Sequence, residues 1–324
     1  MAKVHFLNVN QGDCILLEHN SGRLTMFDVC AGNIPRQTIV KALEKAMSPA
    51  RGNFRMCENP TNPIDYLRTM GVSEIWRFIL SHPDMDHLDG FDAVMDEFSV
   101  LNFWNSGVER TKPDFSTDTR YQEADWDRYA NVISGKEQGT ECLVKCAGAK
   151  FKYANDDDSS GVGDALRILA PDKELVYRAN KTQDFNDASY IVLYRSAAGK
   201  VLLSGDAHDA TWEYVLDNYE DDVRNVTLLI APHHGRKSGR SYEFLKVVNP
   251  KLTLFGCAPS EHLAYDAWNN RNLNHITNNQ CGCVVAEWAN DQMEIYVENE
   301  MFAAKSGGNT NVKNAQGFFY LGAI

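Results

Sequence analysis

The chain has 324 residues, of which 44% are hydrophobic and 23% charged, and its formal net charge is −12. This length and composition are enough for a sizeable core, which excludes disordered and fibrous proteins. No segment approaches the run of about 18 apolar residues that a membrane span needs, and no secretory signal is recognisable, so we expect a cytoplasmic protein without a membrane partner. The acidic balance disfavours broad binding of duplex nucleic acid, but it allows a phosphorylated small molecule or a single strand as substrate.

In chain order, short strands come first, and strands then alternate with helices on both sides of a stretch without clear pattern. The predicted strands span residues 3–8, 13–18, 24–28, 75–80, 189–195, 200–204, 226–230, 252–256, 283–287 and 293–298. The predicted helices span residues 35–47, 64–70, 119–133, 209–219, 241–248 and 261–271. This order predicts one layered α/β domain over residues 1–298, with a variable insert at 102–185 and a partly mobile C-terminal tail at 299–324.

Eight cysteines are scattered along the chain, without the pattern of a secreted disulfide framework. Two close pairs, Cys142/Cys146 and Cys281/Cys283, lack a second pair at the spacing of zinc ligands. We therefore expect the cysteines to be small buried side chains in a reducing compartment.

The most informative segment is 81–90, which directly follows the predicted strand 75–80. Within six residues it holds four side chains that commonly bind metals, namely His82, Asp84, Asp86 and His87. Packed together without a cation, such groups would repel one another or be costly to desolvate. A helix cap is the alternative interpretation, but a cap needs only one such residue. The segment therefore predicts a metal site.

Two later segments have the same form, a predicted strand that ends in polar side chains. Residues 201–205 lead to Asp206, and residues 226–232 lead to the pair His233 and His234. Each segment alone is a weak signal. Together with the first loop, they supply enough ligands for two cations bridged by one carboxylate.

These segments resemble the metallo-β-lactamase superfamily, whose motif is HxHxDH, and most closely the hydrolase domain of ComEC-type competence proteins. The resemblance extends over residues 3–298 and rests on seven segments in order: 4–16, 26–28, 82–90, 186–189, 206, 232–235 and 244–251. It implies a four-layer αββα metallo-β-lactamase sandwich with two metal ions at one edge. It implies the hydrolase chemistry only, and not DNA uptake.

The resemblance also implies the metal ligands. The first ion would be bound by His82 and Asp84, and the second by Asp86, His87 and His234. Asp206 would bridge the two ions. The remaining ligand of the first ion is usually a histidine where this chain has Asn186, which is a weak ligand.

Asp86 and His233 are the expected catalytic residues. Of the histidine pair, the resemblance favours His234 as the ligand, because the ligand in related sites immediately precedes the glycine. Neighbouring side chains of an extended strand point to opposite sides, so only one of the pair faces the metal unless the chain has already turned at Pro232. His233 is then a candidate for general acid–base catalysis, and a packed neutral imidazole is the alternative.

The expected chemistry follows from the metal pair. Two cations about 3.5–4 Å apart can share a hydroxide and offset charge on a phosphoryl transition state. Zinc is the expected metal, and manganese and iron are alternatives because Asp84 makes the first site harder. Three basic residues, Arg236, Lys237 and Arg240, follow the histidine pair and are the expected substrate-binding residues, although a solvated loop would have the same composition.

The sequence thus predicts a dinuclear metal-dependent hydrolase, a phosphodiesterase or nuclease that attacks a phosphate ester with a metal-bridging hydroxide. Two alternatives remain open. One is a hydrolase of carboxylic esters, lactones or amides with the same fold, and the other is a metal-binding component of a multiprotein system without activity.

Overall fold

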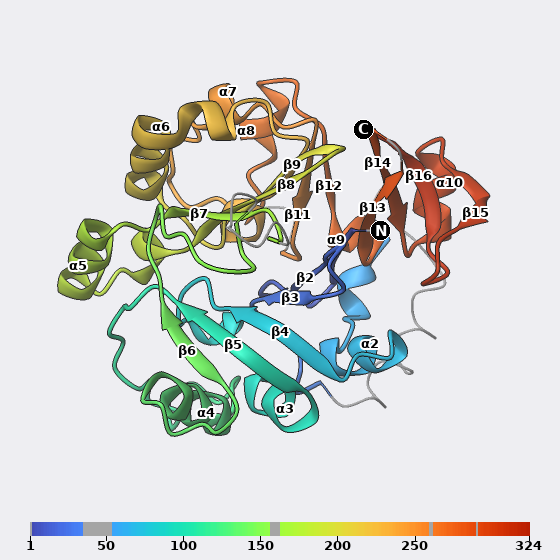
Figure 1. Cartoon of the computed structure of the whole chain (residues 1–324). Helices are drawn as coiled ribbons and strands as arrows, with labels where there is room; N and C mark the ends of the chain where they lie inside the picture. Colours follow the sequence, from blue (N-terminus) through green and yellow to red (C-terminus); the bar gives the residue numbers. More distant parts are fainter. Residues whose placement is uncertain (1, 35–53, 156–162, 259–261, 290) are drawn as a thin grey trace.

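Two β-sheets lie face to face between two layers of helices (Figure 1). The structure is a computed structural model, and it describes residues 2–34, 54–155, 163–258, 262–289 and 291–324. The predicted αββα order of layers is confirmed. The predicted helix 35–47 falls outside the described residues.

The first sheet has the strand order β15-β16-β14-β13-β1-β2-β3-β4-β5-β6. Its strands are β1 (Lys3–Phe6), β2 (Ile15–Glu18), β3 (Leu24–Phe27), β4 (Glu74–Ile79), β5 (Ser99–Asn105), β6 (Glu141–Val144), β13 (Val284–Ala289), β14 (Gln292–Val297), β15 (Asn309–Lys313) and β16 (Phe319–Ala323). Strand β1 pairs antiparallel with both β2 and β13. The beginning of the chain therefore lies in the middle of this sheet, beside a strand from near its end.

The second sheet has the strand order β12-β11-β10-β9-β8-β7. Its strands are β7 (Leu166–Ala170), β8 (Ile191–Ser196), β9 (Gly199–Leu203), β10 (Leu228–Ile230), β11 (Leu252–Phe255) and β12 (His275–Thr277). Strands β9 to β12 are parallel, so their carboxyl ends share one edge of the sheet.

Helices cover the outer face of each sheet. The first sheet is covered by α2 (Pro63–Thr69), α3 (Phe91–Glu97) and α4 (Glu123–Ile133), and the second by α6 (Asp209–Val223), α7 (Leu245–Val248) and α8 (Tyr265–Asn269). The remaining helices are α5 (Lys173–Thr182), α9 (Asn278–Cys281) and α10 (Glu300–Lys305), with short 3-10 turns η1 (Met56–Glu58), η2 (Met85–His87), η3 (Phe185–Ala188) and η4 (Pro232–Gly235). Among the described residues, no helix combines the length and apolarity that crossing a membrane would require.

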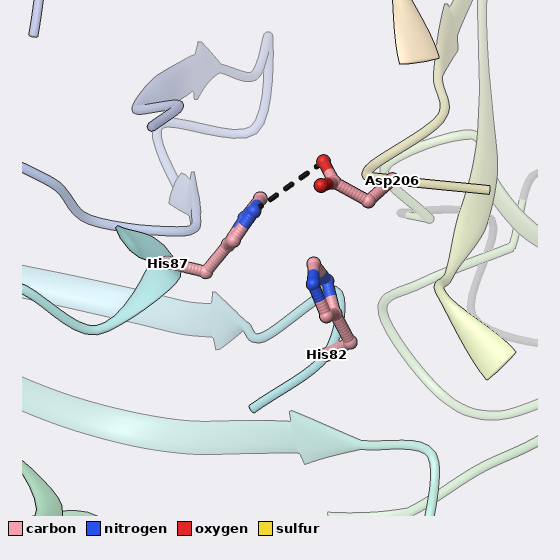
Figure 2. Close-up of side chains that lie close together, drawn as sticks. All are labelled: His82, His87 and Asp206. Atoms are coloured by element: carbon pink, nitrogen blue, oxygen red, sulfur yellow. Dashed lines mark ion pairs between the residues drawn. The ribbon is translucent and has the colours of Figure 1, made fainter. Parts of the chain in front are cut away.

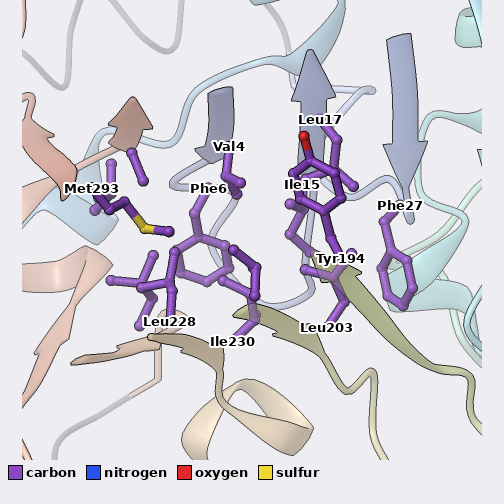
Figure 3. Packing of buried hydrophobic residues seen from close by; sticks show 14 of the residues in the cluster. Val4, Phe6, Ile15, Leu17, Phe27, Tyr194, Leu203, Leu228, Ile230 and Met293 are labelled. Atoms are coloured by element: carbon purple, nitrogen blue, oxygen red, sulfur yellow. The ribbon is translucent and has the colours of Figure 1, made fainter. Parts of the chain in front are cut away.

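The core between the sheets is built from alternate residues of their strands (Figure 3). Phe6 of β1 lies in this cluster together with Leu228 and Ile230 of β10, whereas the intervening Leu229 packs in the cluster under the outer helices. This is the two-residue period of a strand. Each such fully buried side chain contributes about 1.5–3 kcal/mol to stability, so the alternation determines which face of each strand turns inward.

The structure differs from the sequence prediction in two regions. Residues 102–185, predicted as an insert, supply strands to both sheets, because they contain β6, the edge strand of the first sheet, and β7, the edge strand of the second. Residues 299–324, predicted as a tail, form α10, β15 and β16, and β16 pairs with β14. The predicted helix 241–248 begins only at Leu245, since Tyr242 has a left-handed φ of 55°, which a right-handed helix excludes.

All eight cysteines are free, and most are buried, as predicted. The buried ones are Cys14, Cys30, Cys257, Cys281 and Cys283. Within the described ranges, the side-chain groups with metal-binding geometry contain no cysteine. Cys57 is partly exposed, and its interaction with the neighbouring Cys257 side chain lowers its pKa to about 7.

This pKa predicts the reactivity of Cys57. Because the thiolate is the nucleophile, alkylation of Cys57 by iodoacetamide should be half-maximal near pH 7. Peptide mapping by mass spectrometry at a series of pH values measures this midpoint. Cys257→Ala removes this interaction and should move the midpoint towards about 8.5, the ordinary value of a cysteine. An equal midpoint in both proteins would contradict the interaction.

Candidate metal centre

The candidate ligands come from the ends of strands in both sheets. His82 and His87 follow β4 of the first sheet, Asp206 follows β9 of the second, and His234 lies in η4 after β10. Figure 2 shows the side chains of His82, His87 and Asp206 pointing toward one another. Residues far apart in the sequence thus meet at one edge of the sandwich.

The loop that carries His82 to His87 is fixed at both ends by β3 and its extension. The backbone N–H of Ser81 donates to Asp28 Oδ1 (2.7 Å), and the backbone N–H of Val29 donates to the carbonyl of His87 (3.1 Å). The turn between β1 and β2 also lies against this loop, because a Cβ at Gly12 would be 1.8 Å from the Asp86 carbonyl oxygen. Only glycine fits there without displacing the loop.

The ligand atoms lie at distances suited to a shared cation. His87 Nε2 is 3.4 Å from Asp206 Oδ1, and His234 Nε2 is 3.5 Å from the same oxygen and 3.6 Å from Asp86 Oδ2. These distances are long for hydrogen bonds. They are near the separation of roughly 3.4 Å between two ligands of a tetrahedral zinc with bonds of about 2.1 Å.

Several buried atoms of this cluster have no hydrogen-bond partner among the described residues. They include Nε2 of His82, His87 and His234 and Oδ1 of Asp206. Each unsatisfied buried polar group costs about 1–3 kcal/mol, so a protein rarely gathers several without a ligand for them. The residues therefore fit one or more bound metal ions.

Two further carboxylates orient the imidazoles. Asp28 Oδ2 lies 2.8 Å from His87 Nδ1, and Asp13 Oδ1 lies 3.0 Å from His234 Nδ1. The hydrogen bond at His87 Nδ1 holds the ring proton there, so the Nε2 lone pair faces the cluster, as in known metal sites. The contact of Asp13 with His234 Nδ1 is an ion pair. Neither Asp13 nor Asp28 has a role predicted from the sequence, although both lie in segments that carry the resemblance.

The same carboxylates dominate the electrostatics. Burial disfavours a charged imidazole, but Asp28 and Asp206 outweigh this effect and raise the pKa of His87 well above its ordinary value. For His234, Asp13 and Asp206 likewise outweigh burial and raise the pKa to about 10. The cluster therefore attracts positive charge strongly, whether as protons or as metal ions.

Asp84 and Asn186 lie at the margin of the cluster. Asp84 Oδ2 is 3.7 Å from His82 Nε2, while its other carboxylate oxygen pairs with Arg110. The amide nitrogen of Asn186 forms a hydrogen bond of 3.4 Å with His208 Nε2, so this side chain contacts His208 and not the ligand cluster. His208 also belongs to a third acidic group, with Asp184 and Asp187, that the sequence analysis missed.

The histidine pair lies in a turn and not in an extended strand. His233 and His234 both have left-handed backbones, with φ of 53° and 56°, so the chain has already turned at Pro232 and strand alternation does not apply. Both rings face Asp206, but His234 approaches Oδ1 and His233 approaches Oδ2 at 3.7 Å. His234 is fully buried, whereas a quarter of the His233 side chain is exposed.

The three basic residues after the histidine pair point in different directions. Arg240 is buried and donates to His233 Nδ1 (2.8 Å) and to the Asp206 carbonyl (2.7 Å). Arg236 reaches the carbonyl of Gln11 (3.4 Å), and Lys237 is exposed. Arg240 therefore supports the cluster from within, which the sequence pattern did not indicate.

A cavity of about 570 Å³ opens beside Asp84 and Asn186. Arg110 lines it, with its guanidinium 5.6 Å from the centre of the Phe185 ring and paired with Asp84. Lys112 also lines the cavity but is held by Glu123 and Asp127 of α4. Arg110 was not predicted as a site residue, because no motif marks it within the stretch 102–185.

The chain is similar to known proteins in its three-dimensional structure and not in its sequence. No family model matches the sequence, and no curated protein is significantly similar to it. Among solved structures, the chain is similar to a diphosphatase of the PhnP family (TM-score 0.46, 11% identity, covering 89% of this chain and 98% of that chain). It is also similar to a metal-dependent hydrolase of the β-lactamase superfamily (TM-score 0.45, 14% identity, covering 86% and 96%).

A third similar structure is CmlA, a diiron β-hydroxylase from Streptomyces venezuelae (TM-score 0.42, 10% identity). This match covers 85% of the present chain and 52% of CmlA. At these identities and TM-scores the likeness is one of fold, and the chemistry of the site follows from this chain's own residues.

The carboxylates behind the imidazoles generate a prediction about metal affinity. Asp28→Asn and Asp13→Asn should each weaken zinc binding by about 10–100-fold, because the imidazole loses the partner that fixes its tautomer. Competitive titration with a chromogenic chelator measures the affinity. Asp217→Asn, an exposed carboxylate on α6, controls for the change in net charge. If all three variants bind zinc equally, Asp13 and Asp28 do not act on the metal centre.

Proposed function

We propose that this chain is a hydrolase that uses two divalent metal ions to cleave phosphate esters, as a phosphodiesterase or nuclease related to the ComEC-type hydrolases. The observation that carries the proposal is the convergence of unpartnered buried atoms from His82, His87, Asp206 and His234. A purely structural polar cluster would have satisfied these atoms with one another.

Individual residues of the cluster have distinct roles in the proposed metal centre. Asp206 belongs to the group of His82 and His87, and its Oδ1 also faces His234, which suits a bridging carboxylate. When bound, two such cations supply Lewis acidity and a hydroxide nucleophile at neutral pH. Zinc suits the imidazoles, and the share of carboxylates also allows manganese or iron.

The cavity beside Asp84 supports an anionic substrate. Arg110 pairs with only one oxygen of Asp84, and a guanidinium has five N–H donors, so it has donors left for a phosphoryl oxygen. A neutral ester or lactam would have no use for this charge. The substrate class is therefore a phosphorylated small molecule or a single-stranded nucleic acid, with its phosphate near Arg110.

The substrate class is tested by a comparative assay. After reconstitution with zinc or manganese, the protein should hydrolyse bis-p-nitrophenyl phosphate faster than chromogenic carboxylic esters or lactams, and a chelator should abolish the activity. Arg110→Ala should raise KM for the phosphodiester, because the guanidinium binds the negatively charged phosphate of the substrate. Hydrolysis of esters or lactams alone would overturn the phosphodiesterase proposal, and no hydrolysis with full metal content would favour a non-catalytic metal protein.

The bridging role of Asp206 makes a prediction about metal content. Elemental analysis of the reconstituted wild type should give two metal ions per chain. Asp206→Ala should lose at least one of them together with activity, because two cations would then be less neutralised. Asp217→Ala, on the exposed face of α6, should retain both ions. Unchanged metal content in Asp206→Ala would place the bridge elsewhere.

A further inference from the structure

The contact between Arg240 and His233 determines which ring nitrogen of His233 holds the proton. Arg240 Nη1 lies 2.8 Å from His233 Nδ1, and Arg240 Nη2 lies 2.7 Å from the Asp206 carbonyl oxygen. A guanidinium has only N–H donors. His233 Nδ1 must therefore accept this hydrogen bond, and the proton of the neutral ring lies on Nε2.

Among the residues that the structure describes, none forms a hydrogen bond with the Nε2–H group of His233, so this group can bind another molecule. It lies 3.7 Å from Asp206 Oδ2, which is too long for a hydrogen bond. The side chain of His233 is 25% exposed, whereas those of His82, His87 and His234 are fully buried. A substrate beside Asp206 can thus reach this N–H group.

The proton on Nε2 also means that His233 cannot bind a metal ion through this atom, unlike the histidines of the candidate ligand set. A ring nitrogen that holds a proton has no lone pair for a cation. In agreement with this, His233 belongs to none of the groups with metal-binding geometry in the described part of the chain. His87 and His234 show the opposite arrangement, because their Nδ1 atoms face carboxylates and their Nε2 atoms face the cluster.

The backbone fixes the direction of the ring. The N–H of His233 donates to the Gly205 carbonyl (2.9 Å), directly before Asp206, and the His233 carbonyl accepts from Arg236 (2.8 Å). Arg240 is itself buried and also donates to Ser238 Oγ (2.6 Å). The ring Nε2–H group of His233 is therefore held in place before a substrate binds. Such pre-positioning is the condition for effective stabilisation of charge in a transition state.

We propose that His233 is a catalytic hydrogen-bond donor whose Nε2–H binds an anionic oxygen of the substrate, and that Arg240 is the residue that positions it. The inference rests on the proposed phosphoesterase function and deepens it. For a phosphate ester, the bound group is a non-bridging phosphoryl oxygen. No proton is transferred, so His233 acts neither as a general acid–base nor as a metal ligand.

The first test needs no substrate. Long-range ¹H–¹⁵N correlation spectra of the metal-free and the zinc-loaded protein report the tautomer of each histidine, and the His233→Gln spectrum identifies the signals of His233. We expect the Nε2–H tautomer in both states. Arg240→Leu should give a mixture of tautomers, and Arg240→Lys, which still offers only donors, should restore the Nε2–H form. An Nδ1–H tautomer in the wild type would overturn the inference.

The second test compares two substitutions of His233 by kinetics on aryl phosphodiesters. His233→Gln keeps a neutral N–H donor of similar reach and should stay within about 10-fold of the wild type, whereas His233→Leu should lose about 10²–10³-fold in kcat. Both variants should retain the wild-type metal content. The loss in His233→Leu should be equal for good and poor leaving groups.

The outcomes separate the inference from the function on which it rests. Equal losses in Gln and Leu variants, or a loss that grows with the pKa of the leaving group, would indicate proton transfer and overturn the donor role. Loss of metal in His233→Gln would identify His233 as a ligand and overturn it as well. A metal-loaded wild type without phosphodiesterase activity would count against the proposed function, while the tautomer would still decide the role of Arg240.

Discussion

Burial of carboxylates at the shared edge of the two sheets is the constraint on which the rest of the site depends. Asp13, Asp28 and Asp206 are almost entirely removed from solvent, so each needs a positive or hydrogen-bonding partner. Backbone N–H groups and imidazoles supply part of this need. The buried polar atoms that still lack a partner lie together at this edge, and they are the reason to infer metal ions there.

The two sheets hold complementary parts of the centre. Asp13, in the turn after β1 of the first sheet, contacts His234, which follows β10 of the second. Asp28 instead orients His87 within the first sheet. Because the distance between the sheets is set by the side chains of the core, packing far from the centre determines how closely the two halves of the ligand set approach.

The sequence was most informative where short apolar runs end in polar residues. Strands β1 to β4 and β8 to β11 were predicted in place, since their apolar residues alternate between two buried faces and turns separate them. The segment 82–87 was recognisable because its four ligand types follow one strand so closely. Local pattern and motif therefore sufficed for the layers and for most of the candidate ligands.

Other features could not be predicted, because they depend on contacts between distant segments. Residues 102–185 contain partly exposed edge strands such as β6, which lack a clear period. Arg110 matters only through its pairing with Asp84, and Arg240 only through its hydrogen bond to His233. The turn at Pro232, which the sequence left as an alternative, brings both histidine rings towards Asp206. It could not be chosen in advance, because two consecutive left-handed residues have no sequence signature when neither is glycine.

The pairing of β1 with β13 has a consequence for biosynthesis. Strand β1 leaves the ribosome before the other strands of this sheet, yet one of its two partners, β13, is made only after both β6 and the whole second sheet. Until then the inner strands of the first sheet expose an open edge, which is the kind of surface that joins other nascent chains. The whole candidate ligand set, by contrast, is complete once His234 has emerged. Ions bound at the proposed centre at this stage would hold the unfinished sheets together before their remaining strands arrive.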